Sequence, residues 1–341
     1  MFPEPSTGQR DTGGRPAFPA SGGAPLSRFA RPRGSGTTIA LVSDSHLTPT
    51  ARGSMKVFHR TKQRFQMAIA DAHRLDVDGV VVAGDITKDG RADEFRLADT
   101  LVETLPEPTV VLPGNHDVGP QRLLSDGAAF GRRYGHNGYP VTTAMGSATV
   151  HGVDSTSPAT NHDGGATAAP ELAELTTQSR PQIAVMHQPL APIPAPFDSV
   201  LPETDYRVHN PKATADALVE AGVELVVTGH LHWPFATTYR GLNVVGAPGC
   251  STFPPSYLLL HIDARGTTVT VVPLAGEEGL TEAYDSAVND HDRGAVIRSV
   301  VQDGYFRSFP QIDKQRPSSR QSGQSPTPTE PTSQTPSGRS G

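Results

Sequence analysis

Five short polar clusters, each directly after an apolar run, contain the residues whose chemistry could define this protein. In chain order they are Asp44-Ser45-His46, Gly84-Asp85, Gly114-Asn115-His116-Asp117, His187 and Gly229-His230-Leu231-His232. Their carboxylates, carboxamide and five imidazoles could hold two adjacent metal ions and leave one imidazole free for proton transfer. Asp-x-His and His-x-His are each common by chance, so the prediction rests on the presence of all five clusters.

The elements that must position these clusters follow from the apolar periodicity. We expect strands at 38–42, 79–83, 109–112, 147–153, 182–186 and 224–227, with helices at 56–75, 92–105 and 210–221. Three further strands, at 242–245, 257–262 and 267–272, are expected to form a terminal antiparallel meander. The alternation is typical of βαβ units, whose parallel strands bring their carboxyl ends to one rim where ligands bind.

Composition divides the chain into a folded centre and two polar ends. Hydrophobic residues make up only 35% of 341 residues, while Gly 34 and Pro 32 are high counts. We therefore expect a disordered N-terminal tail over 1–36, a catalytic domain over 37–308 and a disordered Ser/Thr/Pro-rich C-terminal tail over 309–341.

Charge and cysteine content exclude several classes of protein. A net charge of −6 argues against stable nucleic-acid binding. The single cysteine, Cys250, excludes an internal disulfide and is expected to be a small buried residue. The sequence has neither an apolar stretch of membrane-spanning length nor a secretory signal, so a cytoplasmic protein without a membrane span is expected.

The ligand types narrow the choice of metal. Imidazole, carboxylate and amide oxygen without thiolate suit Mn²⁺, Fe²⁺/Fe³⁺ or Zn²⁺. The basic residues Arg52, Lys56, Arg60 and Arg64 follow the first cluster and could contact a phosphate, but such residues most often form a solvated face.

The ordered set of clusters resembles the calcineurin-like metallophosphoesterase superfamily, whose motifs run Asp-x-His, Gly-Asp, Gly-Asn-His-Asp/Glu, His and Gly-His-x-His. The resemblance covers residues 38–274. It implies a first metal on Asp44, His46, Asp85 and His232, with Asp85 bridging to a second. It also implies that Asn115, His187 and His230 complete the second metal site.

The same resemblance implies the fold and the mechanism. The fold would be an α/β four-layer α-β-β-α sandwich with two mixed sheets. A metal-bridging hydroxide would attack the phosphorus, while His116 stays off the metals and protonates the leaving oxygen. Asp117 would orient the His116 ring, as carboxylates commonly do for functional imidazoles.

Two positions separate the chain from other branches of the superfamily. Lys88 stands where purple acid phosphatases have tyrosine, and Pro113 stands where protein Ser/Thr phosphatases have arginine. The residues within its motifs are most similar to those of class III cyclic-nucleotide phosphodiesterases. We therefore predict hydrolysis of a small phosphodiester, foremost a 3′,5′-cyclic nucleotide. The alternatives are another ester, such as a phospholipid head group or a nucleotide, or a non-catalytic scaffold; the sequence leaves homodimer formation open.

Overall fold

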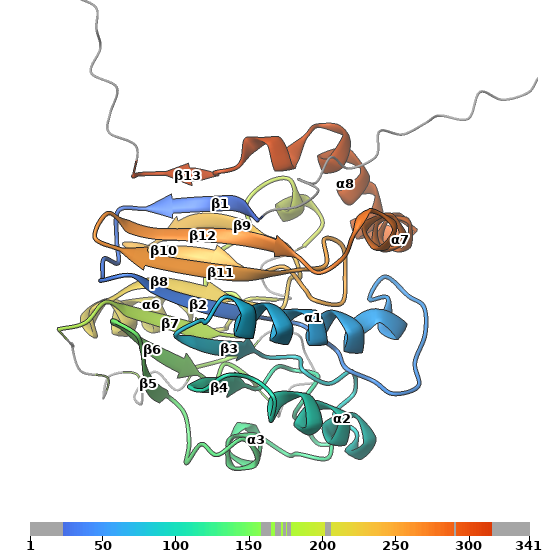
Figure 1. Cartoon of the computed structure of the whole chain (residues 1–341), viewed down its shortest axis with the longest axis horizontal. Helices are drawn as coiled ribbons and strands as arrows, with labels where there is room; N and C mark the ends of the chain where they lie inside the picture. Colours follow the sequence, from blue (N-terminus) through green and yellow to red (C-terminus); the bar gives the residue numbers. More distant parts are fainter. Residues whose placement is uncertain are drawn as a thin grey trace, which may run out of the picture.

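The computed structural model describes residues 23–157, 165–167, 172, 175, 179–201, 206–289 and 291–315. Two mixed β-sheets lie face to face and form the centre of the molecule (Figure 1). Short irregular segments connect the strands to helices on the outer sides.

The first sheet has seven strands in the order β13-β1-β12-β11-β2-β3-β4. Along the chain they are β1 (Ala24–Phe29), β2 (Thr37–Val42), β3 (Gly79–Ala83), β4 (Thr109–Leu112), β11 (Ser256–Asp263), β12 (Gly266–Pro273) and β13 (Ile312–Asp313). Strands β2, β3 and β4 run parallel to one another, and β11 joins β2 antiparallel.

The second sheet has six strands in the order β5-β6-β7-β8-β10-β9. They are β5 (Val141–Met145), β6 (Ala148–Val153), β7 (Gln182–Met186), β8 (Val223–Thr228), β9 (Phe235–Tyr239) and β10 (Leu242–Gly246). Strands β6, β7, β8 and β10 are parallel, and β5 and β9 are antiparallel edge strands.

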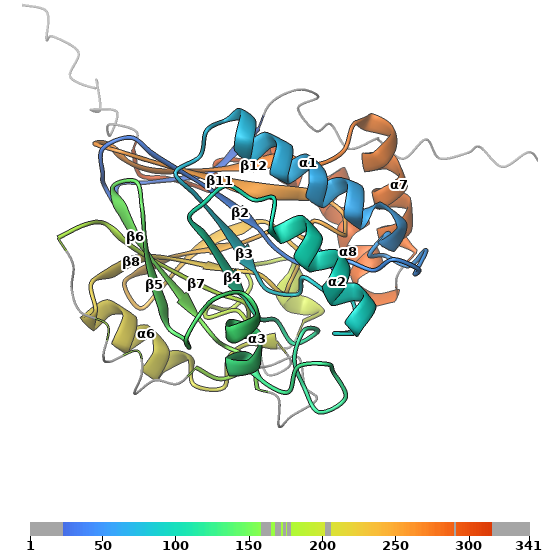
Figure 2. The ribbon, with the colours of Figure 1, turned by 60° about the horizontal axis from the view of Figure 1, so that its bottom comes forward.

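Helices cover both outer faces of the paired sheets (Figure 2). They are α1 (Thr61–Arg74), α2 (Ala92–Val102), α3 (Gly127–Arg133), α6 (Pro211–Glu220), α7 (Glu277–Val288) and α8 (His291–Gln302), with single turns η1 (Phe58–Arg60), η2 (Phe197–Ser199) and η3 (Tyr305–Ser308). Helices α1 and α2 lie on the first sheet and α6 on the second, which gives the predicted four layers.

Strand periodicity explains the layering. In β3, Val81 and Ala83 point between the sheets, whereas Val80 and Val82 pack under α1 and α2. Both faces of this strand are buried, so its sequence is a continuous apolar run, as expected for a parallel strand with both faces covered.

Three sequence-based expectations are corrected. Strand β1 lies inside the segment expected to be a disordered tail and pairs with β12 and β13. The predicted three-stranded terminal meander is also wrong, because β10 belongs to the second sheet while β11 and β12 form a hairpin in the first. Residues 312–313 form β13 within the expected C-terminal tail. The remaining tail predictions, for 1–22 and 316–341, lie outside the described residues.

Two smaller expectations concern burial and membrane contact. Cys250 is fully buried, as predicted, and burial raises the pKa of its thiol to about 12. Within the described part of the chain, no helix has the length and apolar character needed to cross a membrane.

Candidate metal centre

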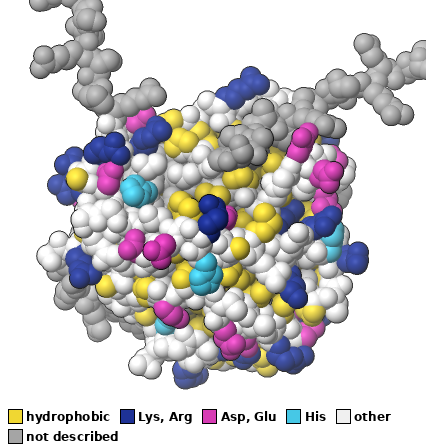
Figure 3. Space-filling view, viewed as in Figure 1, with side chains coloured by type: hydrophobic (Ala, Val, Ile, Leu, Met, Phe, Trp, Pro, Cys, Tyr) yellow, Lys and Arg dark blue, Asp and Glu magenta, His cyan; other side chains and the backbone are white. Residues whose placement is uncertain are grey.

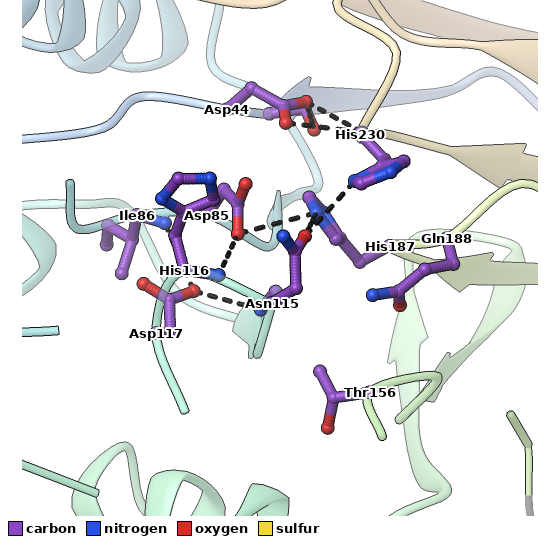
Figure 4. A network of polar contacts seen from close by, with 12 residues as sticks. Asp44, Asp85, Ile86, Asn115, His116, Asp117, Thr156, His187, Gln188 and His230 are labelled. Atoms are coloured by element: carbon purple, nitrogen blue, oxygen red, sulfur yellow. Dashed lines mark hydrogen bonds and ion pairs between the residues drawn. The ribbon is translucent and has the colours of Figure 1, made fainter. Parts of the chain in front are cut away.

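The five polar clusters meet at the carboxyl ends of five parallel strands, as the sequence predicts. They follow β2, β3 and β4 of the first sheet and β7 and β8 of the second. Figure 4 shows side chains from these clusters turned toward one another, namely Asp44, Asp85, Asn115, His187 and His230.

The first group contains Asp44, His46, Asp85 and His232, all of them buried. Nε2 of His232 lies 3.0 Å from Oδ1 of Asp44. Nε2 of His46 lies 3.2 Å from Nε2 of His232 and 3.5 Å from Oδ2 of Asp85. Four potential ligand atoms therefore point at one place.

The second group contains Asp85, His187 and His230. Nε2 of His187 lies 3.4 Å from Oδ1 of Asp85. The carboxamide oxygen of Asn115 lies 3.2 Å from Nε2 of His187 and 3.1 Å from Nδ1 of His230, so Asn115 belongs to this group as well. Asp85 is shared, since Oδ2 faces the first group and Oδ1 the second. This is the arrangement that a bridging carboxylate requires.

The backbone under these side chains is strained. Asp44 (φ 54°), His46 (φ 44°), Asp85 (φ 50°), His230 (φ 69°) and His232 (φ 59°) all adopt the left-handed region. Residues other than glycine rarely do so, and such strain gathers at functional sites. The strained turns let residues two apart in the chain aim at the same centre.

Glycine permits the close approach of the neighbouring loops. A Cβ at Gly114 would lie 2.2 Å from Oδ1 of Asp85, and one at Gly84, where φ is +87°, would lie 2.4 Å from Nδ1 of His187. Any larger residue at either position would push a candidate ligand out of place.

Burial and neighbouring charges keep most of the imidazoles neutral. Burial lowers the pKa of His46 well below its usual value, and the charge of Lys56 lowers it further. Burial likewise lowers the pKa values of His230 and His232. His187 behaves differently, because the attraction of Asp85 outweighs its burial and raises its pKa to about 9.

The two carboxylates stay ionised. Burial alone would raise their pKa values, but the attraction of His187 and His116 holds the pKa of Asp85 well below its usual range. His232 has the same effect on the pKa of Asp44, and the Ser43 hydroxyl donates a hydrogen bond to Asp44 Oδ2 at 2.5 Å. Sequence reasoning missed Ser43, which has no distinctive signal beside the Asp-x-His motif.

The donor set fits metal ions. Two buried carboxylates and several imidazole lone pairs converge, and burying such charge without a compensating cation is costly. A cation held by Asp85 and His187 would take the place of the proton that the Asp85 carboxylate favours on His187. The residues present thus suit two adjacent ions, as the sequence predicts.

His116 lies beside both groups, but Asp117 does not orient it. Nδ1 of His116 lies 2.6 Å from the carbonyl oxygen of Lys88, and the backbone N–H of His116 donates to Asp85. The Asp117 carboxylate instead accepts hydrogen bonds from the backbone of Ile86, Thr87 and Gly114 and from the Thr87 hydroxyl. The predicted Asp117–His116 contact is therefore wrong, and a carbonyl oxygen has replaced it.

The basic residues after the first cluster do not share a solvated face. Arg64 is buried and donates to the carbonyl oxygen of Ser251, and Arg60 bonds with Glu282. Lys56 lies with its ammonium 3.4 Å from Nε2 of His116. Arg52 is exposed.

Comparison with known proteins agrees with the geometry. A family model described as calcineurin-like phosphoesterase matches residues 37–234. The chain is 25% identical over 235 residues to a probable cyclic nucleotide phosphodiesterase of Xenorhabdus bovienii (strain SS-2004), covering 62% of this chain and 85% of that protein.

A solved structure shares the fold. The crystal structure of a dimetal phosphatase from Danio rerio superposes with a TM-score of 0.52 at 15% identity, over 70% of this chain and 97% of the other. The family match covers more than half of the chain and contains all five clusters. The protein therefore belongs to the calcineurin-like phosphoesterase family and is a metal-dependent phosphoester hydrolase.

Proposed function

We propose that the protein hydrolyses a small phosphodiester, foremost a 3′,5′-cyclic nucleotide, at a centre of two metal ions. The observation that carries this proposal is Asp85, whose two oxygens face two converging sets of ligands. The probable cyclic nucleotide phosphodiesterase of Xenorhabdus bovienii supports the choice of substrate.

The chain's own residues supply binding, orientation and a proton. His116, Asn115 and His230 are the partly exposed members of the site, so the substrate would approach from their side. A carbonyl oxygen can only accept, so Nδ1 of His116 must donate to Lys88. In the doubly protonated ring, Nε2 is then the atom that would give a proton to the leaving oxygen. When bound, two metal ions would polarise the phosphoryl oxygens and activate a water molecule.

The surface supports a small substrate over a nucleic acid. On the face shown in Figure 3, acidic and basic side chains are interspersed, whereas nucleic-acid binding requires a basic patch or stripe. The net charge of −6 also argues against a nucleic-acid substrate.

A metal-reconstituted assay tests the substrate. Purified protein loaded with Mn²⁺, Fe²⁺ or Zn²⁺ would be given bis(p-nitrophenyl) phosphate, p-nitrophenyl phosphate, 3′,5′- and 2′,3′-cyclic nucleotides, and a glycerophosphodiester. We expect the highest kcat/KM for a 3′,5′-cyclic nucleotide. A higher kcat/KM for a monoester or a glycerophosphodiester would show that this ester, and not a cyclic nucleotide, is the preferred substrate. If no ester is hydrolysed, the proposed catalytic activity is wrong.

Two substitutions test the assignment of roles. Asp85→Asn should abolish turnover and lower bound metal, because each ion loses a charged ligand. His116→Ala should lower kcat by about 10²–10⁴-fold with metal content unchanged, which is the usual contribution of a general acid. Asp93→Asn, at a partly exposed position in the first turn of α2, is the matched control for charge. Full activity of Asp85→Asn would show that the site has been misassigned.

A further inference from the structure

A buried arginine lies behind the first group of candidate ligands. Arg64 is in the first turn of α1, yet only 3% of the residue is exposed. Its Nη1 lies 2.9 Å from the carbonyl oxygen of Ser251 and 3.5 Å from that of Cys250. A guanidinium carries several N–H donors in one rigid plane, so a single side chain can hold two successive carbonyl groups. Arg64 therefore joins α1 to the loop between β10 and β11.

The same two loop residues bond to the segment that follows β2. The backbone N–H of Cys250 donates to the carbonyl oxygen of Ser43 at 2.9 Å. The backbone N–H of Ser251 donates to the carbonyl oxygen of Asp44 at 3.2 Å. Hydrogen bonds thus run from the guanidinium through the loop to the Asp-x-His motif, with Arg64 at one end and Asp44 at the other.

Asp44 requires this support because its backbone is strained. Its φ of 54° is left-handed, and a residue other than glycine keeps such a conformation only where its surroundings enforce it. The N–H of Asp44 donates to the carbonyl oxygen of Gly84, and its carboxylate accepts from the N–H of His230. The bond from Ser251 fixes the carbonyl end of Asp44, and this is the bond that Arg64 supports.

The loop also contacts a second ligand of the same group. A Cβ at Gly249 would lie 2.9 Å from Cβ and Cγ of His232, so the loop backbone packs directly against that residue. A shift of the loop would therefore displace both Asp44 and His232. Asn115 and His187 of the second group lie on other loops, after β4 and β7. The position of this loop thus matters more for the first group than for the second.

We propose that Arg64 is a positioning residue of the metal centre, which holds the loop between β10 and β11 so that Asp44 and His232 stay aimed at the ion of the first group. This inference rests on the proposed two-metal function. Loss of the guanidinium should weaken that ion by about 10–100-fold, the usual effect of removing an outer partner of a metal ligand. The ion of the second group should be affected less.

Calorimetric titration of chelator-treated, full-length protein with Mn²⁺ tests the proposal. Arg64→Met keeps an unbranched apolar stem but donates no hydrogen bond, and it should lower Mn²⁺ affinity. Arg64→Lys can donate to one carbonyl group and should fall between Arg64→Met and the wild type.

Two backgrounds show which ion is weakened. Asn115→Ala removes a ligand of the second group only, and His46→Ala removes one of the first group only. Arg64→Met should lower Mn²⁺ affinity strongly in the Asn115→Ala background and little in the His46→Ala background. A role confined to general stability would not produce this difference.

Thermal unfolding of the metal-free variants provides the control for stability. Leu101→Ala, near the C-terminal end of α2, removes buried apolar volume from the same side of the first sheet. It should lower Tm and leave the affinity for both ions unchanged. If Arg64→Met does not fold, Arg64→Lys and Arg64→Gln take its place in both backgrounds.

The outcomes separate this inference from the proposed function. A loss of affinity concentrated in the first group supports the role of Arg64. Unchanged affinities, or an equal loss in both backgrounds, would overturn it even if the wild type hydrolyses esters normally. A wild type that binds two ions but hydrolyses no ester would refute the proposed function alone. A wild type that binds no metal would overturn both.

Discussion

Asp117 follows His116 in the sequence but serves a different purpose in the structure. Its two oxygens accept four hydrogen bonds from Ile86, Thr87 and Gly114, so it joins the loop after β3 to the loop after β4. Burial and the nearby charge of Asp85 raise the pKa of Asp117 to about 7, and the bonds from Thr87 and Gly114 oppose that rise. Its role is to hold Asp85 and Asn115 in register.

Asp117→Asn should separate these loops. The amide nitrogen of asparagine cannot accept, so at least one buried backbone donor loses its partner, which typically costs about 1–3 kcal/mol. We expect a lower free energy of unfolding in denaturant titrations and weaker metal binding, with the ratio of kcat values at high and low pH little changed. Wild-type stability with a selectively altered pH profile of kcat would instead restore Asp117 as the partner of His116.

The sequence predicts which residues form the metal centre, but not which groups these side chains contact. The seven candidate ligands follow from their positions at strand ends, where parallel strands bring them together. The partner of His116 is a main-chain carbonyl, and any residue at position 88 supplies one. Lys56 was grouped with a solvated face because the turn at Val57, which directs it inward, depends on packing with distant residues.

Elements were predictable where an apolar run is buried on both faces. Strands β3, β4 and β7 have the bounds expected from the sequence, since each is a short continuous apolar stretch. Strand β1 is rich in residues typical of loops, and pairing with β12, more than 200 residues away, is what makes it a strand. Helices α7 and α8 were not predicted at all, although residues 277–288 bury Leu280, Ala283 and Ala287 on one face.

The contact between α7 and the segment that carries Lys56 leads to a prediction for Glu282. Glu282→Gln should weaken the bonds to His59 and Arg60 and let the segment move. The free energy of unfolding should then fall, because the segment loses its ion-pair contacts with α7. Denaturant titration of the wild type and Glu282→Gln measures the loss, and equal free energies of unfolding would contradict a stabilising role for these contacts.

The same pair of contacts makes a pH-dependent contribution to stability. Burial raises the pKa of Glu282, but hydrogen bonds from His59 and Arg60 outweigh it and lower the pKa below its usual value. A carboxylate with a depressed pKa stabilises the folded state above its unfolded pKa and loses that contribution as pH falls through the folded pKa. The stability difference between wild type and Glu282→Gln should thus be full above about pH 5 and vanish in more acidic solution.

At the scale of the molecule, the metal centre and the C-terminal helices share one core. Trp233, directly after His232, is buried against Phe197, Phe253, Tyr305 and Phe306. The same cluster includes residues of α7 and α8. Packing rather than substrate contact explains this tryptophan, and the arrangement couples the ligand loop to the end of the described chain.

Metal removal should therefore destabilise the whole domain. A ligand present at a hundred times its Kd stabilises the folded state by about 2.7 kcal/mol, which corresponds to about 5–10 °C in Tm for a domain of this size. Scanning calorimetry with and without a chelator measures the shift, and hydrogen exchange should show α7 and α8 losing protection together with the ligand loops. Asp85→Asn should show little shift on chelation, and an equal shift would place the stabilising metal elsewhere.

The left-handed backbone at His46, Asp85 and His230 also limits how this protein could evolve. Alanine at such a position would remove the ligand and keep the strain, whereas glycine would remove both. A related chain that no longer needed to bind metal would gain folding stability if glycine replaced these residues. The present side chains thus represent a compromise in which the fold accepts lower stability to keep its geometry. Engineering for heat resistance should start far from these loops, although relieving their backbone strain would raise stability.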